Sequence, residues 1–209
     1  MKTKSALVAT FLSMIGLLFF CGCGSPIQTI SLPDKTKIHS IYVSSNLGKE
    51  FQFAQLGATN FTMQLEIIPD DAGLLAGVST GMQKVLESRG YTIAKEAALA
   101  DAVLDLQPGA AGAMRTQIGA VVGAGFQIQR AFGLYLATIV TARIDMQLRD
   151  PKTSVIMASA SAFRYEISPI KKDASKWSAF TESEQNALMK ALNDQLLTVP
   201  EDGVKQLGL

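Results

Sequence analysis

The chain has 209 residues, of which 48% are hydrophobic, and its 19 basic and 18 acidic side chains leave a formal net charge of +1. This balance excludes the strongly basic surface by which proteins bind nucleic acid, and the single histidine belongs to no evident cluster of metal ligands. We therefore expect no nucleic-acid partner, no metal and no other cofactor.

The first 22 residues have the composition of an export signal. Lys2 and Lys4 form a short positive start, an uncharged apolar run covers residues 5–20, and small residues follow it. This is the layout of a secretory signal peptide, and the run is shorter than the ~20 apolar residues that a membrane-spanning helix needs. The alternatives are an uncleaved anchor and a signal that is cleaved without attachment of a lipid.

The signal ends in the sequence Phe20-Cys21-Gly22-Cys23, which resembles the lipobox of bacterial lipoproteins. Gly22 is the small residue before the cut, whereas Phe20 stands where leucine is usual. The resemblance implies cleavage before Cys23 and lipidation of Cys23, including a palmitate-like acyl chain. Each buried methylene contributes ~0.8 kcal/mol, so three chains make a lasting membrane anchor. The next residue, Gly24, is not aspartate, which implies the periplasmic face of an outer membrane.

The chain is thus expected to have three parts. Residues 1–22 form the lipoprotein signal peptide, residues 23–36 a polar tether, and residues 37–209 a single domain. After cleavage Cys23 is the only cysteine left, so the domain has no internal disulfide and depends on its hydrophobic core.

The first part of the domain predicts strands. Residues 38–43 carry apolar side chains on both faces, which indicates an inner strand. Residues 51–53 are expected to pair with a strand over residues 61–67, where apolar and polar side chains alternate strictly. This alternation predicts one buried face, made of Phe61, Met63, Leu65 and Ile67.

A helix is predicted next. Asp70 or Asp71 caps it, an apolar stripe runs from Leu74 to Leu86, and Gly90 follows its end. Three further glycines are spaced by four within it, and each costs ~1 kcal/mol relative to alanine in a helix. Close packing on the sheet explains them, and a contact with a partner helix is the alternative. These glycines are Gly73, Gly77 and Gly81.

The rest of the domain continues this alternation of strands and helices. Strands are predicted over residues 91–95 and 102–107, and a long hairpin over residues 140–149 and 155–166. Thr181 and Glu184 form a capping box that begins a C-terminal helix, and one short helical turn follows it. The predicted fold class is α+β, a mixed or antiparallel sheet with about two main helices packed on one face.

An apolar, glycine-rich segment, residues 109–136, does not fit this pattern. Arg115 and Arg130 interrupt it, so it holds no transmembrane helix. It either covers the open face of the sheet, or binds a lipid, peptide or partner protein, or enters the membrane when several copies assemble. We predict its partner or membrane contacts to be Ile118, Val121, Val122, Phe126, Phe132 and Tyr135.

Two stretches of the domain, Leu86–Tyr91 and Ala100–Leu106, resemble the helix-end and strand sequences of small α+β domains in envelope lipoproteins. Such domains include the lipopolysaccharide-assembly lipoprotein, the penicillin-binding-protein activators, the curli-secretion lipoprotein and the N-terminal domain of the Tol β-propeller protein. The resemblance covers residues 38–197 loosely, and it implies a fold but no functional residue other than Cys23.

The sequence therefore favours a non-enzymatic lipoprotein that is anchored in the cell envelope and binds another envelope component as an accessory or assembly factor. An oligomeric secretion or pore subunit that uses residues 109–136 is the alternative. An envelope hydrolase is a third hypothesis, with His39, Glu66 and Asp105 as its candidate catalytic residues.

Overall fold

The computed structural model describes residues 37–56, 63–109, 121–131 and 134–209. The signal peptide, Cys23 and the tether lie outside the described residues, as do the two predicted contacts Ile118 and Phe132. No helix among the described residues is long and apolar enough to span a membrane.

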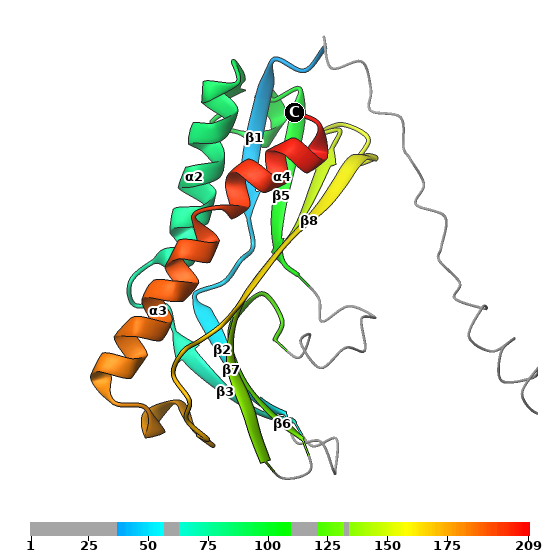
Figure 1. The fold of residues 1–209 in the computed structure, drawn as a ribbon. Coiled ribbons are helices and arrows are strands. Elements are labelled where there is room, and N and C mark those ends of the chain that lie inside the picture. The colour runs from blue at the N-terminus through cyan, green and yellow to red at the C-terminus, as the bar shows by residue number, and fades with distance from the viewer. Residues whose placement is uncertain (1–36, 57–62, 110–120, 132–133) are drawn as a thin grey trace, which may run out of the picture. The chain divides into compact units, whose positions relative to one another are not determined.

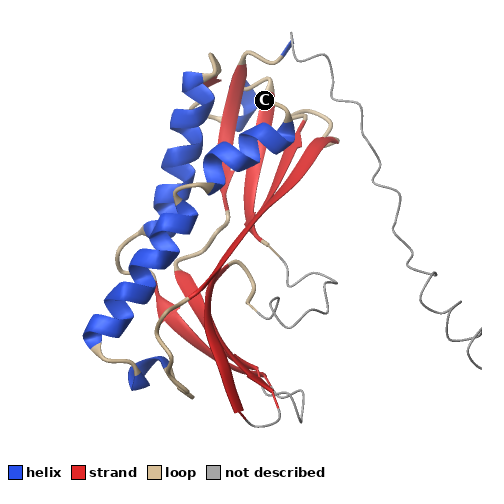
Figure 2. Ribbon diagram, in the orientation of Figure 1, coloured by secondary structure: helices blue, strands red, loops and turns tan. Residues whose placement is uncertain are grey.

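The described residues form an eight-stranded mixed sheet and three α-helices, as the sequence predicts for an α+β domain (Figures 1 and 2). Two short 3-10 helices, η2 (Ala97–Leu99) and η3 (Trp177–Ala179), lie in the connections. The helices are α2 (Leu74–Ser88), α3 (Glu182–Leu196) and α4 (Val199–Leu207). The strands are β1 (Ser40–Ser45), β2 (Glu50–Leu56), β3 (Met63–Pro69), β4 (Thr92–Ile93), β5 (Ala102–Pro108), β6 (Ala124–Ala131), β7 (Leu134–Arg149) and β8 (Ile156–Ile167).

The sheet is organised around its longest strand, β7. On one side β7 pairs with β8 as an antiparallel hairpin, which confirms the hairpin that the sequence predicts. On its other side β6 pairs with the first half of β7 and β5 with the second half. Next to these, β1 lies parallel to β5 and β2 parallel to β6, and β4 and β3 complete the edge. Two pairs of strands, β5 with β6 and β1 with β2, therefore follow one another along single rows.

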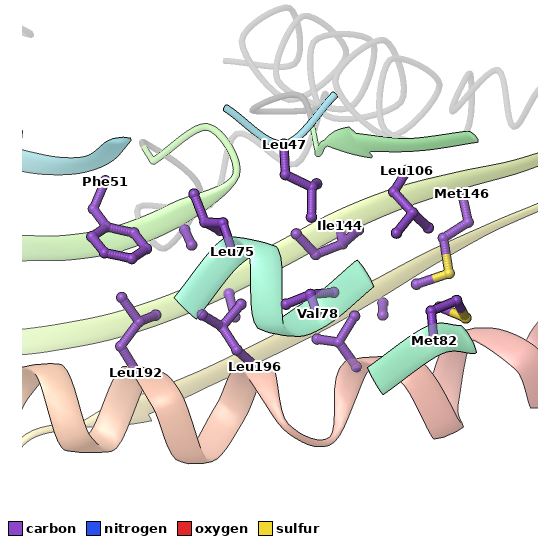
Figure 3. Close-up of a cluster of buried hydrophobic side chains, with 14 of the residues drawn as sticks. Leu47, Phe51, Leu75, Val78, Met82, Leu106, Ile144, Met146, Leu192 and Leu196 are labelled. Carbon is purple, nitrogen blue, oxygen red and sulfur yellow. The ribbon is translucent and has the colours of Figure 1, made fainter. Parts of the chain in front are cut away.

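All three helices pack on one face of the sheet, where the hydrophobic core lies. Leu192 and Leu196 of α3 face Leu75 of α2, and Met82 lies beside Met146 of β7 (Figure 3). The predicted caps are present: the Asp70 carboxylate accepts the first amides of α2, and the Thr181–Glu184 capping box begins α3.

The helix glycines have other roles than close packing on the sheet. Gly73 precedes α2 with a φ of 68°, a left-handed conformation that favours glycine. Gly81 faces α4, because a Cβ there would lie 3.0 Å from Cγ of Pro200. Gly77 faces open space. The contact that requires a small residue is thus one between two helices of the same chain.

The predicted buried face of β3 is wrong. Leu65 and Ile67 are 49% and 51% exposed, on the side away from the helices, whereas Ile68 is buried. The register with β2 explains the reversal, since Ile68 lies opposite the buried Phe51 and Glu66 opposite the buried Phe53. Glu66 is accommodated on the helix side because its carboxylate accepts the Trp177 amide at 2.7 Å.

Candidate functional site

Strands β5 and β6 act as one interrupted strand along β7. Pro108 of β5 lies opposite Ile144, and Ala124 of β6 lies opposite Ala142. Between them the amide of Gly109 donates to the carbonyl of Arg143 (2.9 Å), and the amide of Arg143 donates to the carbonyl of Gly123 (2.7 Å). In an uninterrupted antiparallel strand one residue makes both of these bonds. Residues 110–122 are therefore an insertion at a single position of the sheet.

The two glycines at the base of this insertion are required by the geometry. A Cβ on Gly109 would lie 2.3 Å from Cγ of Arg143, and Gly123 has a φ of 77°. The Gly123 amide also donates to the Gly109 carbonyl at 3.0 Å, which closes the insertion at its base. The sheet is thus continuous beneath residues 110–122.

The neighbouring row breaks at the same level. The pairing of β1 with β5 ends at Ser45 and Leu106, and the pairing of β2 with β6 begins only at Gln52 and Gly125. The link between β1 and β2, residues 46–49, therefore lies beside the insertion. We call this place the seam: residues 46–49 of one row, and residues 109 and 121–123 of the other.

A pocket of about 180 Å³ opens at the seam. It is lined from both sides of the sheet: Gln52 and Ile67 belong to the face away from the helices, while Leu75 and Ile144 belong to the core. Leu47 points toward Ile144 from the link above it (Figure 3). The other lining residues are Gly48, Lys49, Glu50, Pro108, Val122, Gly123 and Ala124.

The pocket has an apolar interior and a polar rim. Leu47, Leu75 and Ile144 are buried, whereas Lys49 and Glu50 are exposed. The Gln52 side chain holds the rim together, since its Oε1 accepts the Val122 amide at 3.0 Å. The arrangement suits an apolar group that enters the sheet and carries polar atoms outside it.

The structure separates the predicted contact residues. Phe126 is fully buried and stacks on Trp177 with 4.7 Å between ring centroids, and Val121 is buried as well. Neither side chain is on the surface of this fold, so their prediction as contacts is corrected: Phe126 lies opposite Phe53 on the core side of the sheet. Tyr135 is half-buried, and its hydroxyl donates to the carbonyl of Ile170.

Val122 remains as an exposed contact, with 38% of its surface accessible beside the pocket. Sequence reasoning missed its neighbour Ile67, because the alternation in β3 assigned that side chain to the core. It also missed Leu134 and Leu136, which are exposed at the start of β7. An irregularity in the β6–β7 register at Gln129 and Arg130 could not be read from the alternation of residue types.

The three hydrolase candidates are not brought together. The amide of His39 donates to Asp101 beside the start of β1, and Asp105 forms an ion pair with Arg149 on the face away from the helices. This bond with Asp105 raises the pKa of Arg149. Glu66 lies in the other half of the sheet, on β3 (Figure 1). Among the described residues there is also no group of three or more His, Cys, Asp and Glu side chains that could hold a metal ion.

Comparison with known proteins gives neither a matching family model nor a matching curated sequence. Three similar solved structures have low identity. Protein XCC0632 from Xanthomonas campestris is 11% identical (TM-score 0.45), with 84% of this chain and 87% of that one covered. Lipoprotein GNA1162 from Neisseria meningitidis is 15% identical (0.34; 75% and 96%), and the PelC dodecamer from Paraburkholderia phytofirmans is 14% identical (0.33; 80% and 90%). Similarity at this level indicates nothing about activity, partner or assembly.

Proposed function

We propose that this chain is a non-enzymatic lipoprotein, anchored through Cys23 on the periplasmic face of the outer membrane, that binds another envelope protein at the seam. The observation that carries the proposal is the pocket with exposed apolar side chains beside it. Leu65, Ile67 and Val122 are all more than a third exposed, and Ile67 and Val122 line the pocket itself. Exposed apolar side chains grouped in this way mark interaction sites.

A protein partner fits the dimensions of the site. About 180 Å³ is close to the volume of one large apolar side chain, and interfaces commonly centre on one such anchor in a pocket. Lys49 and Glu50 at the rim supply both charges, so the rim selects polar atoms around the anchor rather than a strongly charged ligand. The lipid anchor confines the chain to one surface, which raises the effective concentration of the partner, so a modest affinity suffices.

Crosslinking in intact cells tests this site. A photoreactive residue at Val122 should give one discrete adduct with an envelope protein, and the same residue at Leu99, which is 72% exposed on η2, should give none. Ile67→Asp should abolish the Val122 adduct, because it places a charge at the pocket, whereas Leu99→Asp should leave it intact. Equal adducts at both positions, or an adduct insensitive to Ile67→Asp, would contradict the proposal.

An oligomeric secretion or pore subunit is the second candidate. Leu134 and Leu136 favour it, since they expose 69% and 52% of their surface at the end of the β6–β7 hairpin. Arg130 in the same hairpin forms an ion pair with Asp173 and so carries a compensated charge. Gentle extraction in detergent should then yield rings, and Leu134→Asp should dissociate them. A monomer or dimer of the lipidated chain would exclude this candidate.

A further inference from the structure

Strand β8 leaves a long edge of the sheet unpaired. Among the described strands it pairs only with β7, although it has twelve residues. Natural proteins protect such edges with charges, proline or a covering element, because an unpaired edge templates the addition of another strand. In β8 the stretch from Ile156 to Phe163 contains no charge and no proline.

The last five residues of β8 are exposed on both faces. Tyr165 and Ile167 point away from the helices and are 51% and 63% exposed, with Phe163 in line and stacked on Tyr165 at 5.7 Å. Arg164 and Glu166 lie on the opposite face and are also exposed. A single-layer strand end with apolar side chains on one face and opposite charges on the other is a surface prepared for contact.

The order of these residues is self-complementary. If two copies of β8 run antiparallel with Tyr165 opposite Tyr165, then Arg164 of each copy lies opposite Glu166 of the other. In the same register Phe163 lies opposite Ile167, so aromatic and aliphatic side chains form one strip on the face away from the helices. Both kinds of cross-strand pair stabilise antiparallel sheets.

The backbone supports the same register. The amide of Ser168 donates to the carbonyl of Thr138 at 2.8 Å, so the amide and carbonyl of Ser168 point toward β7. Because these groups alternate along a strand, those of Phe163, Tyr165 and Ile167 point outward, away from β7. Pairing about Tyr165 requires outward groups at these three positions. The bond from Arg164 to the Phe163 carbonyl, at 3.3 Å, agrees with this direction and would be exchanged for a bond from the partner's amide.

The charges are available for such a contact. Arg164 forms an ion pair with Asp202 of α4, yet nearly half of its side chain is exposed, so the guanidinium has further donors to offer. Glu166 forms no direct ion pair with another described residue, although its charge raises the pKa of Lys190 together with the nearer Asp194.

We propose that the occupant of this edge is a second copy of the chain, joined by two-fold antiparallel pairing of residues 163–167 of β8. The contact is isologous, so it closes on itself as a dimer and leaves the seam of each copy free. The inference stands independently of the proposed function, since none of its residues lines the seam pocket.

Disulfide trapping tests the register in the lipidated chain, in the membrane where the cell places it. A Tyr165→Cys chain should form a covalent dimer on mild oxidation, because residues directly opposite in a hydrogen-bonded pair have Cα atoms about 5.5 Å apart, within the range of a disulfide. Leu197→Cys, at an exposed position outside β8, is the matched control and should stay monomeric. Equal crosslinking of both variants, no dimer of Tyr165→Cys, or a crosslink to a different protein would overturn the proposal.

Charge exchange tests the partner's identity. Arg164→Glu and Glu166→Arg should each weaken dimerisation about tenfold, because like charges then face each other twice across the axis. The double variant restores opposite charges and should recover the dimer, although it does not recover the ion pair with Asp202. Sedimentation of the detergent-extracted chains measures this, with circular dichroism to verify folding. Single variants as dimeric as the wild type, or a folded double variant that stays monomeric, would disprove the pairing.

Discussion

At the scale of single residues, the close approach of β2 and β6 at Gly125 is the least tolerant point of the sheet. A Cβ there would lie 1.9 Å from the carbonyl oxygen of Gln52, and backbone of a paired strand cannot yield as a flexible side chain does. We expect Gly125→Ala to lower the free energy of unfolding by about 3 kcal/mol. Gly77→Ala is the matched control: Gly77 meets nothing within 4 Å, and alanine there should stabilise α2 by about 0.5–1 kcal/mol. Urea unfolding measures both, and equal effects would contradict this account of the β2–β6 contact.

A second residue-scale prediction concerns Asp101. The backbone amides of His39 and Ser40 donate to its carboxylate, each at 2.9 Å, and these bonds lower the pKa of Asp101. A carboxylate with a depressed pKa in the folded state stabilises the fold above its unfolded pKa of about 3.9 and loses this contribution as the pH falls through the folded value. Asp101→Asn mimics the protonated state. Its urea midpoint should therefore lie below that of the wild type at pH 7 and approach it below pH 4, whereas a difference independent of pH would contradict the role of the charge.

At the scale of elements, the interruption between β5 and β6 predicts which residues the fold does not need. Deletion of residues 110–123 leaves Gly109 to make both backbone bonds with Arg143, and Ala124 then follows opposite Ala142 in register. We expect this variant to unfold cooperatively with a free energy of unfolding within about 2 kcal/mol of the wild type, and to lose the seam contact with the partner. Deleting only residues 110–122 keeps both glycines and forces an extra residue, a bulge, opposite Arg143. That control should be the less stable of the two in urea, and the reverse order would show that the insertion supports the sheet.

Elements whose signal is local could be predicted from the sequence. The β7–β8 hairpin and the Thr181–Glu184 capping box depend on neighbours within a few residues, and both are confirmed. The face of β3 was predicted wrongly because its alternation has two solutions, and the choice depends on a register with β2 that places Ile68 opposite Phe51.

The seam could not be predicted for a related reason. The expectation for residues 109–136 treated them as one apolar segment, whereas the chain divides them among an insertion, β6 and the start of β7. Phe126 and Ile128 do alternate with Gln127 and Gln129, but the surrounding glycines hid this short signal. The pocket itself forms where two rows of the sheet break side by side, and only the tertiary pairing brings those breaks together.

At the scale of the whole molecule, the anchor and the β8 contact act on the same equilibrium. A five-residue strand pair with exposed charges gives modest affinity, because exposed ion pairs contribute only about 0.2–1 kcal/mol each. Lipidation at Cys23 would hold all copies at one surface and so raise their effective concentration, which favours the dimer without any new contact. A soluble chain without the signal and with Cys23→Ser lacks this confinement.

The native mass of these two forms is therefore the decisive comparison. The lipidated chain extracted in detergent should be a dimer, whereas the soluble Cys23→Ser chain should show a monomer–dimer equilibrium that shifts with concentration and with Glu166→Arg. The wild type should also incorporate labelled palmitate and the Cys23→Ser chain should not, since the thiol carries the lipid. A ring that forms only in the lipidated chain would instead place assembly in the membrane-facing residues of the β6–β7 hairpin, because β8 is identical in both forms.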